Sequence, residues 1–238
     1  MAGDPRYLDL DGYHLTEVVY GALPDDLTEL YLDNNPLLDL DCALLPKTLE
    51  VLYVRFNPTL TSIRNIDALP NLVVLELHGC SSLLTLPPLP PKLRTLHLGY
   101  CSGLTALPPL ARLSELLHLD INHTLRLYEL PALPEGLTLL QARYSGLREL
   151  PYLPEKLSWL ELQRSRVVQD GLAPEAGDTE RMSDYATRVR TWWTACLQKE
   201  RFDAIHEELM AAAWHPDRVS KWLSHGEEVL DMMMGVSA

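Results

Sequence analysis

Four histidines between residues 78 and 123 are the side chains of this chain best suited to chemistry. Imidazole nitrogen is a common zinc ligand, and imidazole also changes charge near neutral pH. His78 and His97 fall on adjacent predicted strands with backbones about 8 Å apart, within reach of one metal ion but not pre-organised for it, so we expect no metal and no other cofactor. A surface whose charge follows the pH is a second interpretation. The four residues are His78, His97, His118 and His123.

The cysteines and the absence of known catalytic motifs argue against catalysis. No phosphate-binding loop, Gly-x-Ser-x-Gly elbow or His-Glu-x-x-His motif occurs. Cys196 falls on the apolar face of a predicted helix, where a cysteine is usually a small buried hydrophobe. We therefore predict that the protein is not an enzyme and that its scattered, unpaired cysteines are reduced. They are Cys42, Cys80, Cys101 and Cys196.

A repeat positions these residues. Its template is Leu-x-x-Leu-x-Leu-x-x-(Asn/Cys/Thr/Ser), often followed by Leu-Pro-x-Leu-Pro, and a degenerate copy begins near Leu8. Each copy predicts one short parallel strand with inward leucines, and copies must stack about 4.8 Å apart to close a core. The predicted fold class is an α/β solenoid with a parallel concave sheet over residues 5–168. The copies start 20 to 23 residues apart, at Leu27, Leu49, Leu72, Leu93, Leu116, Leu137 and Leu157.

Two further features of each copy have a structural meaning. The proline-rich returns, such as LPPLPPK, lack the amide donors of a helix, so we expect extended or turn segments on the convex side. The ninth position of each copy carries a side chain that can bond to backbone in the turn leaving the strand. These positions are Asn35, Asn57, Cys80, Cys101, Thr124, Ser145 and Ser165.

On these repeats the chain resembles the leucine-rich repeat family. The LPxLP returns are similar to the short repeats of bacterial effector proteins, and HGCSSLLTLP and GYCSGLTALP resemble the cysteine-type repeats of plant immune receptors. The resemblance covers roughly residues 5–165 and implies a solenoid that binds a partner, without naming a ligand. Some such effectors carry a ubiquitin-ligase domain, but Cys196 lacks the Cys-x-Asp context of that domain.

The variable positions around the inward leucines are expected to line the concave face. They are rich in tyrosine, histidine, tryptophan and arginine, which often anchor protein interfaces. Aromatic residues also tile exposed sheets because of their strand propensity, and this is the alternative interpretation. The predicted partner-binding residues are Tyr31, Tyr53, Arg55, Phe56, His78, His97, Tyr100, His118, Asp120, His123, Tyr144 and Trp159, with Glu76, Arg143, Glu161 and Arg164 on the same face.

After the repeats, residues 169–180 read as a polar linker and residues 181–238 as a helical segment. Three amphipathic patterns are present, beginning near Met182, Phe202 and Val219. Four of the five tryptophans lie here, so the apolar faces must be covered. The helices either cap the last coil or form a small bundle, or they bind a partner or a second copy.

The tail also carries two short resemblances. His-Pro-Asp at residues 215–217 is similar to the signature of J-domain co-chaperones, but the preceding helix is acidic rather than basic. The segment ELMAAAWHPDRVSKWL resembles a tail found in many proteins of giant double-stranded DNA viruses. That resemblance covers about residues 199–238 and implies a viral protein acting in host cytoplasm or packaged in a virion.

Composition restricts the partners. The net charge is −13 with no run of Lys or Arg, which argues against nucleic acid and anionic membranes. No apolar stretch is long enough to span a membrane, and residues 1–10 show no signal-peptide pattern. We therefore expect a cytoplasmic protein that binds another protein through its concave face. The alternatives are a self-assembling structural component of a virion and an adaptor for a host ubiquitin ligase.

Overall fold

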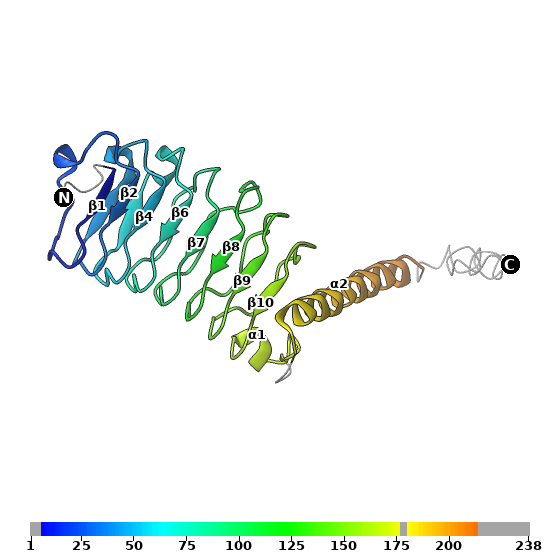
Figure 1. The fold of residues 1–238 in the computed structure, drawn as a ribbon. Coiled ribbons are helices and arrows are strands. Elements are labelled where there is room, and N and C mark those ends of the chain that lie inside the picture. The colour runs from blue at the N-terminus through cyan, green and yellow to red at the C-terminus, as the bar shows by residue number, and fades with distance from the viewer. Residues whose placement is uncertain (1–5, 177–179, 214–238) are drawn as a thin grey trace. The chain divides into compact units, whose positions relative to one another are not determined.

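The computed structural model describes residues 6–176 and 180–213 of the chain. The chain divides into two compact units, Met1–Trp193 and Thr194–Ala238. Stacked coils occupy most of the first unit, each contributing one strand to a single sheet (Figure 1).

The sheet contains eight parallel strands in the order β1-β2-β4-β6-β7-β8-β9-β10. The central residue of each strand is a leucine, and these leucines lie in register from Leu30 through Leu52 to Leu160. Side chains alternate across a strand, so the residues on either side of the leucine face outward. The strands are β1 (Tyr7–Asp9), β2 (Glu29–Tyr31), β4 (Val51–Tyr53), β6 (Val74–Glu76), β7 (Thr95–His97), β8 (His118–Asp120), β9 (Leu139–Gln141) and β10 (Trp159–Glu161).

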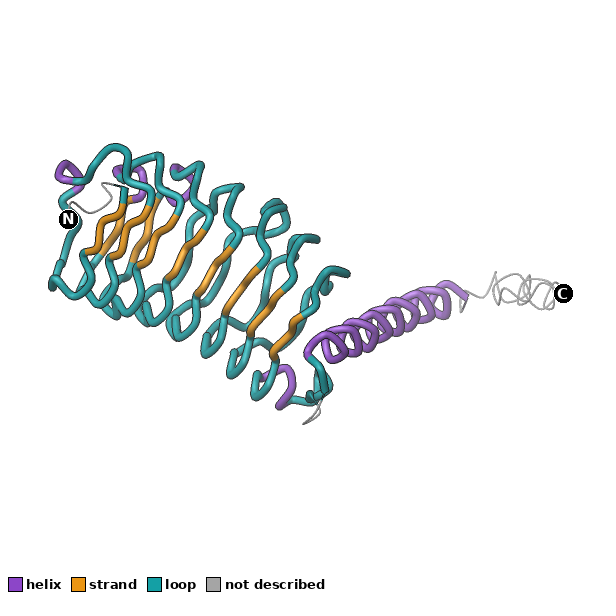
Figure 2. The backbone as a smooth tube through the Cα atoms, viewed as in Figure 1, coloured by secondary structure: helices purple, strands orange, loops and turns teal. Residues whose placement is uncertain are grey.

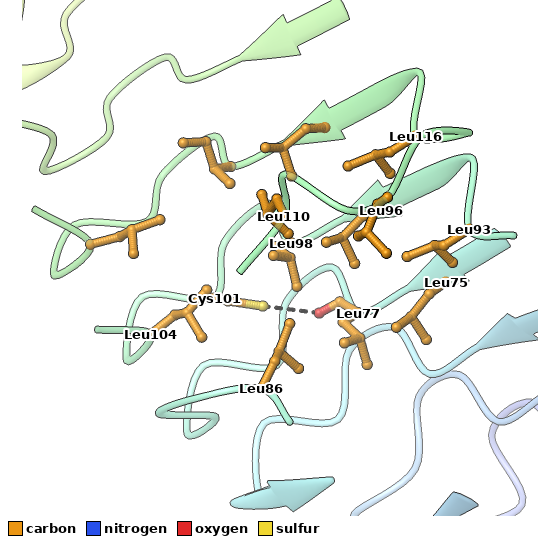
Figure 3. Close-up of a cluster of buried hydrophobic side chains, with 14 of the residues drawn as sticks. Leu75, Leu77, Leu86, Leu93, Leu96, Leu98, Cys101, Leu104, Leu110 and Leu116 are labelled. Carbon is orange, nitrogen blue, oxygen red and sulfur yellow. Dashed lines mark hydrogen bonds between the residues drawn. The ribbon is translucent and has the colours of Figure 1, made fainter. Parts of the chain in front are cut away.

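The core is a continuous column of leucine. The first residue of each of the seven regular copies is buried, from Leu27 at 0% exposure to Leu157 at 2%. Figure 3 shows how Leu75, Leu96 and Leu98 of successive coils pack against one another. The fold is a leucine-rich repeat solenoid, so the predicted fold class is confirmed.

The returns on the convex side differ along the solenoid. Three-residue 3₁₀ helices occur in the first three returns, at η1 (Tyr20–Ala22), η2 (Cys42–Leu44) and η3 (Ile66–Ala68) (Figure 2). A second small sheet pairs β3 (Asp39–Asp41) with β5 (Ser62–Arg64). The four proline-rich returns between residues 86 and 156 contain no helix, as predicted. The residues of the three 3₁₀ helices have backbone N–H groups that can donate hydrogen bonds. In η2, for example, Ala43 N donates to the Asp41 carboxylate at 3.0 Å.

The ninth-position side chains form a ladder that weakens along the chain. Asn57 Nδ2 donates to three carbonyl oxygens, two in its own coil and one in the preceding coil. Cys101 Sγ donates to the Leu77 carbonyl of the preceding coil at 3.1 Å (Figure 3). Thr124 reaches only its own coil. The predicted backbone bond is wrong for Ser145 and Ser165, whose buried hydroxyls have no partner among the described residues.

The last coil is covered by the segment that follows it. After α1 (Arg166–Gln169), Ala173 is buried, and the Tyr185 hydroxyl donates to the Pro174 carbonyl at 2.9 Å. The first turns of α2 (Met182–Ala213) add Tyr185, Ala186 and Val189 to the repeat core. These turns therefore cap the solenoid, which removes its exposed apolar end.

The first two helical patterns of the tail form one helix, α2, rather than two. The residues between them, Leu197–Arg201, include strong helix formers and no glycine or proline that would interrupt the backbone bonds. The third pattern and the WHPDRVSKWL segment lie outside the described residues. Within the described part of the chain, no helix has the length and apolar character needed to span a membrane.

Candidate functional site

The predicted site residues occupy two parallel lines on the solenoid. One line is the exposed face of the strands, where Tyr31, Tyr53, His97, His118, Asp120 and Trp159 lie. The other line runs through the turns that follow the C-terminal ends of the strands, on the side of the sheet where α1 follows β10 (Figure 1). We call the rings in this second line the aromatic row. Its members are Phe56, His78, Tyr100, His123 and Tyr144.

The aromatic row is continuous over five coils. Neighbouring ring centroids are 5.2, 4.9, 4.1 and 4.6 Å apart, and the last two pairs are stacked nearly parallel. The Arg164 guanidinium lies 5.6 Å from the Tyr144 ring and continues the line into the next coil. Ring faces are occupied by neighbours in the stacked part, so a partner meets ring edges, tyrosine hydroxyls and imidazole nitrogens there.

The backbone of this row lies in an unfavourable conformation. Phe56, Tyr100, His123 and Tyr144 have φ between 54° and 60°, the left-handed region that bulky residues rarely adopt. That conformation costs about 1–2 kcal/mol per residue for an L-amino acid. Asn34, at the same position of an earlier coil, has φ 52° and is the type of residue usually found there. The chain therefore carries strained aromatic residues where Asn or Gly would be more stable.

In the coil that contains β6, a glycine rather than an aromatic residue occupies the left-handed position. Gly79 takes the left-handed position with φ 79°, and the ring comes from the preceding residue, His78. A Cβ atom on residue 79 would lie 2.7 Å from the Phe56 ring, so only glycine leaves room for the row there. The row is thus unbroken even where the side chain at the left-handed position is missing.

A hollow of about 770 Å³ opens beside the middle of the row. Its lining combines apolar rings with hydroxyls and imidazoles, which suits a mixed apolar and polar contact. Phe56, Tyr100 and Leu125 on its rim are 49%, 49% and 58% exposed, an uncommon amount for large apolar side chains that lie together. The hollow is lined by Phe56, His78, Gly79, Ser81, Tyr100, Ser102, His123 and Leu125.

At the N-terminal end of the strand face, three tyrosines stack across successive coils. Tyr31 lies 4.7 Å from Tyr53 in a parallel stack and 5.0 Å from Tyr7. The Tyr31 hydroxyl donates to Glu29 at 3.0 Å, and burial together with this carboxylate raises the pKa of Tyr31 to about 12. The hydroxyl therefore stays protonated at physiological pH.

An ion pair orients the arginine beside this stack. Asp33 is 3% exposed and accepts from both Arg55 N and Arg55 Nε, at 2.7 and 2.8 Å. The guanidinium of Arg55 then lies 4.8 Å from the Tyr53 ring. A charge-assisted pair with a buried carboxylate and a ring contact holds Arg55 in one orientation.

The centre of the strand face holds a cluster of titratable groups. His97 Nδ1 lies 2.6 Å from Glu76 Oε1, its register partner on β6. Asp120 occupies the same register on β8, and burial raises its pKa. Gly99 makes room for the cluster, because a Cβ atom there would lie 2.8 Å from His78 Nδ1 and 3.0 Å from Asp120.

The pair between His97 and Glu76 predicts a pH dependence of stability. The hydrogen bond with Glu76 raises the pKa of His97 above 6.5, although burial opposes this, and Asp120 and His78 are the other titratable groups nearby. The stabilisation of the folded state by protonated His97 is fully present below pH 6.5 and is lost as the pH rises through the folded-state pKa of His97. Between about pH 6 and pH 8 we expect a loss of about 1 kcal/mol or less, because the pair is partly exposed.

Urea unfolding at both pH values measures this loss. Glu76→Gln should flatten the difference between the two pH values relative to the wild type. An unchanged pH dependence in Glu76→Gln would show that His97 titrates without the help of Glu76.

The remaining predicted residues of the strand face lie toward its C-terminal end. Trp159 Nε1 donates to Glu161 at 2.8 Å, and Gln141 bridges to the same carboxylate at 3.4 Å. His118 is exposed at the first position of β8. The structure thus separates His118 from the row, whereas it brings His78 and His123 into it.

The cysteines of the ladder are unsuited to nucleophilic chemistry. Cys80 is free and buried, and burial raises its pKa to about 12; burial also raises the pKa of Cys101. Both thiols therefore stay protonated and act as hydrogen-bond donors. No group of three or more His, Cys, Asp or Glu residues that could hold a metal ion is found in the described part of the chain.

Sequence reasoning did not single out Tyr7, Asp33, Gly99 or Leu125. A usable signal existed for Asp33, because it occupies the same repeat position as Arg55 in the next coil, where opposite charges meet. Gly99 is the only glycine at that position of the seven regular copies. Leu125 and Tyr7 carried no signal of this kind.

No protein-family model and no curated protein matches the sequence. YopM, a leucine-rich effector protein from Yersinia pestis, is 25% identical over 67% of this chain and 49% of its own, with a TM-score of 0.48. YopM from Yersinia enterocolitica WA-314 is 30% identical over 60% of this chain and 34% of its own, with a TM-score of 0.43.

A third solved structure is the functional domain of InlJ from Listeria monocytogenes, which includes a cysteine ladder. It is 16% identical over 67% of this chain and 63% of its own, with a TM-score of 0.21. This chain spans about half the length of one YopM chain and about a third of the other. These TM-scores are low, so the likeness carries no functional argument.

Proposed function

We propose that this protein is a non-enzymatic interaction module that binds a partner protein through the aromatic row and the adjoining strand face. The partner would contact the predicted residues Tyr31, Tyr53, Arg55, Phe56, His78, His97, Tyr100, His118, Asp120, His123, Tyr144 and Trp159.

The observation that supports this most is the strain of the aromatic row. Stacking of two rings contributes about 0.5–1.5 kcal/mol beyond burial, and a left-handed bulky residue costs about 1–2 kcal/mol. The row therefore yields little or no net stability, and its members at Phe56 and Tyr100 remain half exposed. Backbone strain that stability does not require is typical of functional sites. The alternative, that aromatic residues only tile a sheet, does not explain rings in turns.

The strain suggests a variant that removes a ring without harming the fold. Tyr100→Asn places at φ 60° a residue that accepts this conformation, as Asn34 does in an earlier coil. We expect its free energy of unfolding to stay within about 1 kcal/mol of the wild type. Retention of the partner should fall about tenfold or more. Affinity capture with each purified protein, followed by quantitative mass spectrometry, measures the retention.

Tyr152→Asn is the matched control, because Tyr152 is 52% exposed but lies in a convex return. A genuine partner is retained by the wild type and by Tyr152→Asn and lost with Tyr100→Asn. Equal retention by both variants would remove the row from the interface. A loss of stability above about 2 kcal/mol in Tyr100→Asn would instead assign the row a structural role.

The other functions expected from the sequence stay predictions. The virion or assembly component would associate through the tail or the flanks, and the ubiquitin-ligase adaptor would recruit the ligase through the tail, whose residues 214–238 lie outside the described part of the chain. The viral origin depends on the same segment, and the cytoplasmic location stays a prediction from the sequence.

A further inference from the structure

Five exposed arginines gather on one flank at the C-terminal end of the solenoid. They lie in the turns and return starts that follow β8, β9 and β10, at residues 122–128, 143–148 and 163–168 (Figure 1). These segments contain no aspartate or glutamate, although the chain has 33 acidic residues against 20 lysines and arginines. We call this surface the arginine flank. Its residues are Arg126, Arg143, Arg148, Arg164 and Arg166.

Backbone bonds between coils bring the three segments side by side. His123 N donates to the Arg143 carbonyl at 2.8 Å, and Tyr144 N donates to the Gln163 carbonyl at 3.1 Å. Farther along the same turns, Arg148 N donates to the Tyr128 carbonyl at 2.9 Å. Residues about twenty positions apart in the sequence therefore lie side by side in successive coils.

Two of these arginines are held in place by aromatic rings. The Arg148 guanidinium lies 4.4 Å from the centroid of Tyr128, and that of Arg164 lies 5.6 Å from the centroid of Tyr144. A guanidinium that lies over a ring keeps its N–H groups free at its edge, in the fork geometry that matches a carboxylate. Less side-chain entropy is then lost when an anion binds.

Most arginines of the flank form no ion pair within the described part of the chain, although the exposed Glu129 and Glu149 directly follow two of its segments. Arg166 pairs with Asp170 at 3.0 Å, but Arg126, Arg143, Arg148 and Arg164 form no ion pair with any described residue. By contrast, Arg55, Arg94 and Arg188 elsewhere in the chain each contact a carboxylate. Four like charges kept together without partners raise the electrostatic energy of the protein alone, and an anionic ligand would lower it.

We propose that the arginine flank binds an acidic polypeptide segment of the partner. The inference rests on the proposed function and names the chemistry of one part of the partner, because the flank adjoins the aromatic row at Tyr144. An acidic segment fits better than nucleic acid. The net charge of −13 opposes a long polyanion, whereas a short run of Asp and Glu needs to cover only the flank.

Fluorescence anisotropy of the full chain with a labelled peptide of alternating glutamate and glycine tests the proposal. The double variant Arg148→Glu/Arg164→Glu should weaken binding about tenfold or more, and binding by the wild type should weaken as salt is added. The matched control is Arg112→Glu/Lys156→Glu, which changes the net charge equally at two exposed cations in the returns. Binding by the control should stay within about twofold of the wild type.

Equal weakening by both double variants would overturn the proposal, because only the net charge would then matter. Absence of peptide binding by the wild type would also overturn it. Single-stranded DNA of equal charge that binds more tightly than the peptide would assign the flank to nucleic acid instead. Partner capture that depends on Tyr100, without any peptide binding, would leave the proposed function intact and remove only the flank. Circular dichroism of each variant verifies its fold.

Discussion

Replacement of Asn57 by alanine should lower the free energy of unfolding by about 3 kcal/mol or more. Its amide nitrogen donates to the carbonyl oxygens of Leu32, Val54 and Arg55, each at 3.0 Å, and its amide oxygen accepts from Leu37 N at 3.4 Å. Asn57 is 0% exposed, so water cannot replace these bonds without entering the core. Chemical denaturation monitored by circular dichroism measures the loss.

Asn57→Cys provides the control that identifies the cause. Cysteine occupies the same position in the next two coils, where Cys80 Sγ donates to the Val54 carbonyl at 3.1 Å. Asn57→Cys should therefore keep the bond between coils and lose clearly less stability than Asn57→Ala. Equal losses in the two variants would mean that the bond to the preceding coil contributes nothing.

Replacement of Leu96 by alanine should cost about 2–5 kcal/mol. Leu96 is fully buried at the centre of β7, where it packs beside Leu75 (Figure 3). It lies in register between Leu75 and Leu119 of the neighbouring coils. Its removal leaves a cavity that stacked coils cannot close, because the backbone bonds on both sides hold the spacing. The same denaturation experiment gives the loss.

The exposed Leu84 makes the matched comparison for Leu96. Leu84 is 51% exposed in the turn region of the preceding coil, so Leu84→Ala deletes the same atoms without opening a cavity. We expect its effect to stay within about 0.5 kcal/mol. A Leu96→Ala protein as stable as Leu84→Ala would be incompatible with a continuous leucine core.

Much of the fold follows from residue types at a regular period. The template predicted every buried first leucine from Leu27 to Leu157, and the ladder of Asn35, Asn57 and the two cysteines, because burial and turn chemistry depend on local spacing. The ladder prediction was wrong at Ser145, whose buried hydroxyl has no partner among the described residues although the equivalent hydroxyl of Thr124 bonds to the Ile121 carbonyl, so residue type alone does not decide whether the bond forms. The first two amphipathic patterns of the tail belong to one helix, because no residue between them interrupts it.

The candidate site was predictable only as a set of exposed positions. The alternation of side chains placed Tyr53, His97 and Tyr100 outward, but it did not show that a turn residue such as Tyr100 has φ 60°. Nor did it pair His97 with Glu76, or gather Arg148 and Arg164 on one flank. The contacts of His97 with Glu76, Arg148 with Tyr128 and Arg164 with Tyr144 join residues 20 or 21 positions apart, in coils whose lengths vary from 20 to 23 residues.

Period and residue type along the chain therefore determine which side chains are buried and which face the solvent, because each coil repeats the same local chemistry. Stacking of the coils decides which exposed side chains meet. Only stacking brings equivalent positions of neighbouring coils into register, and only the backbone conformation of each turn decides where a ring points. The strained aromatic row and the arginine flank are consequences of the tertiary structure.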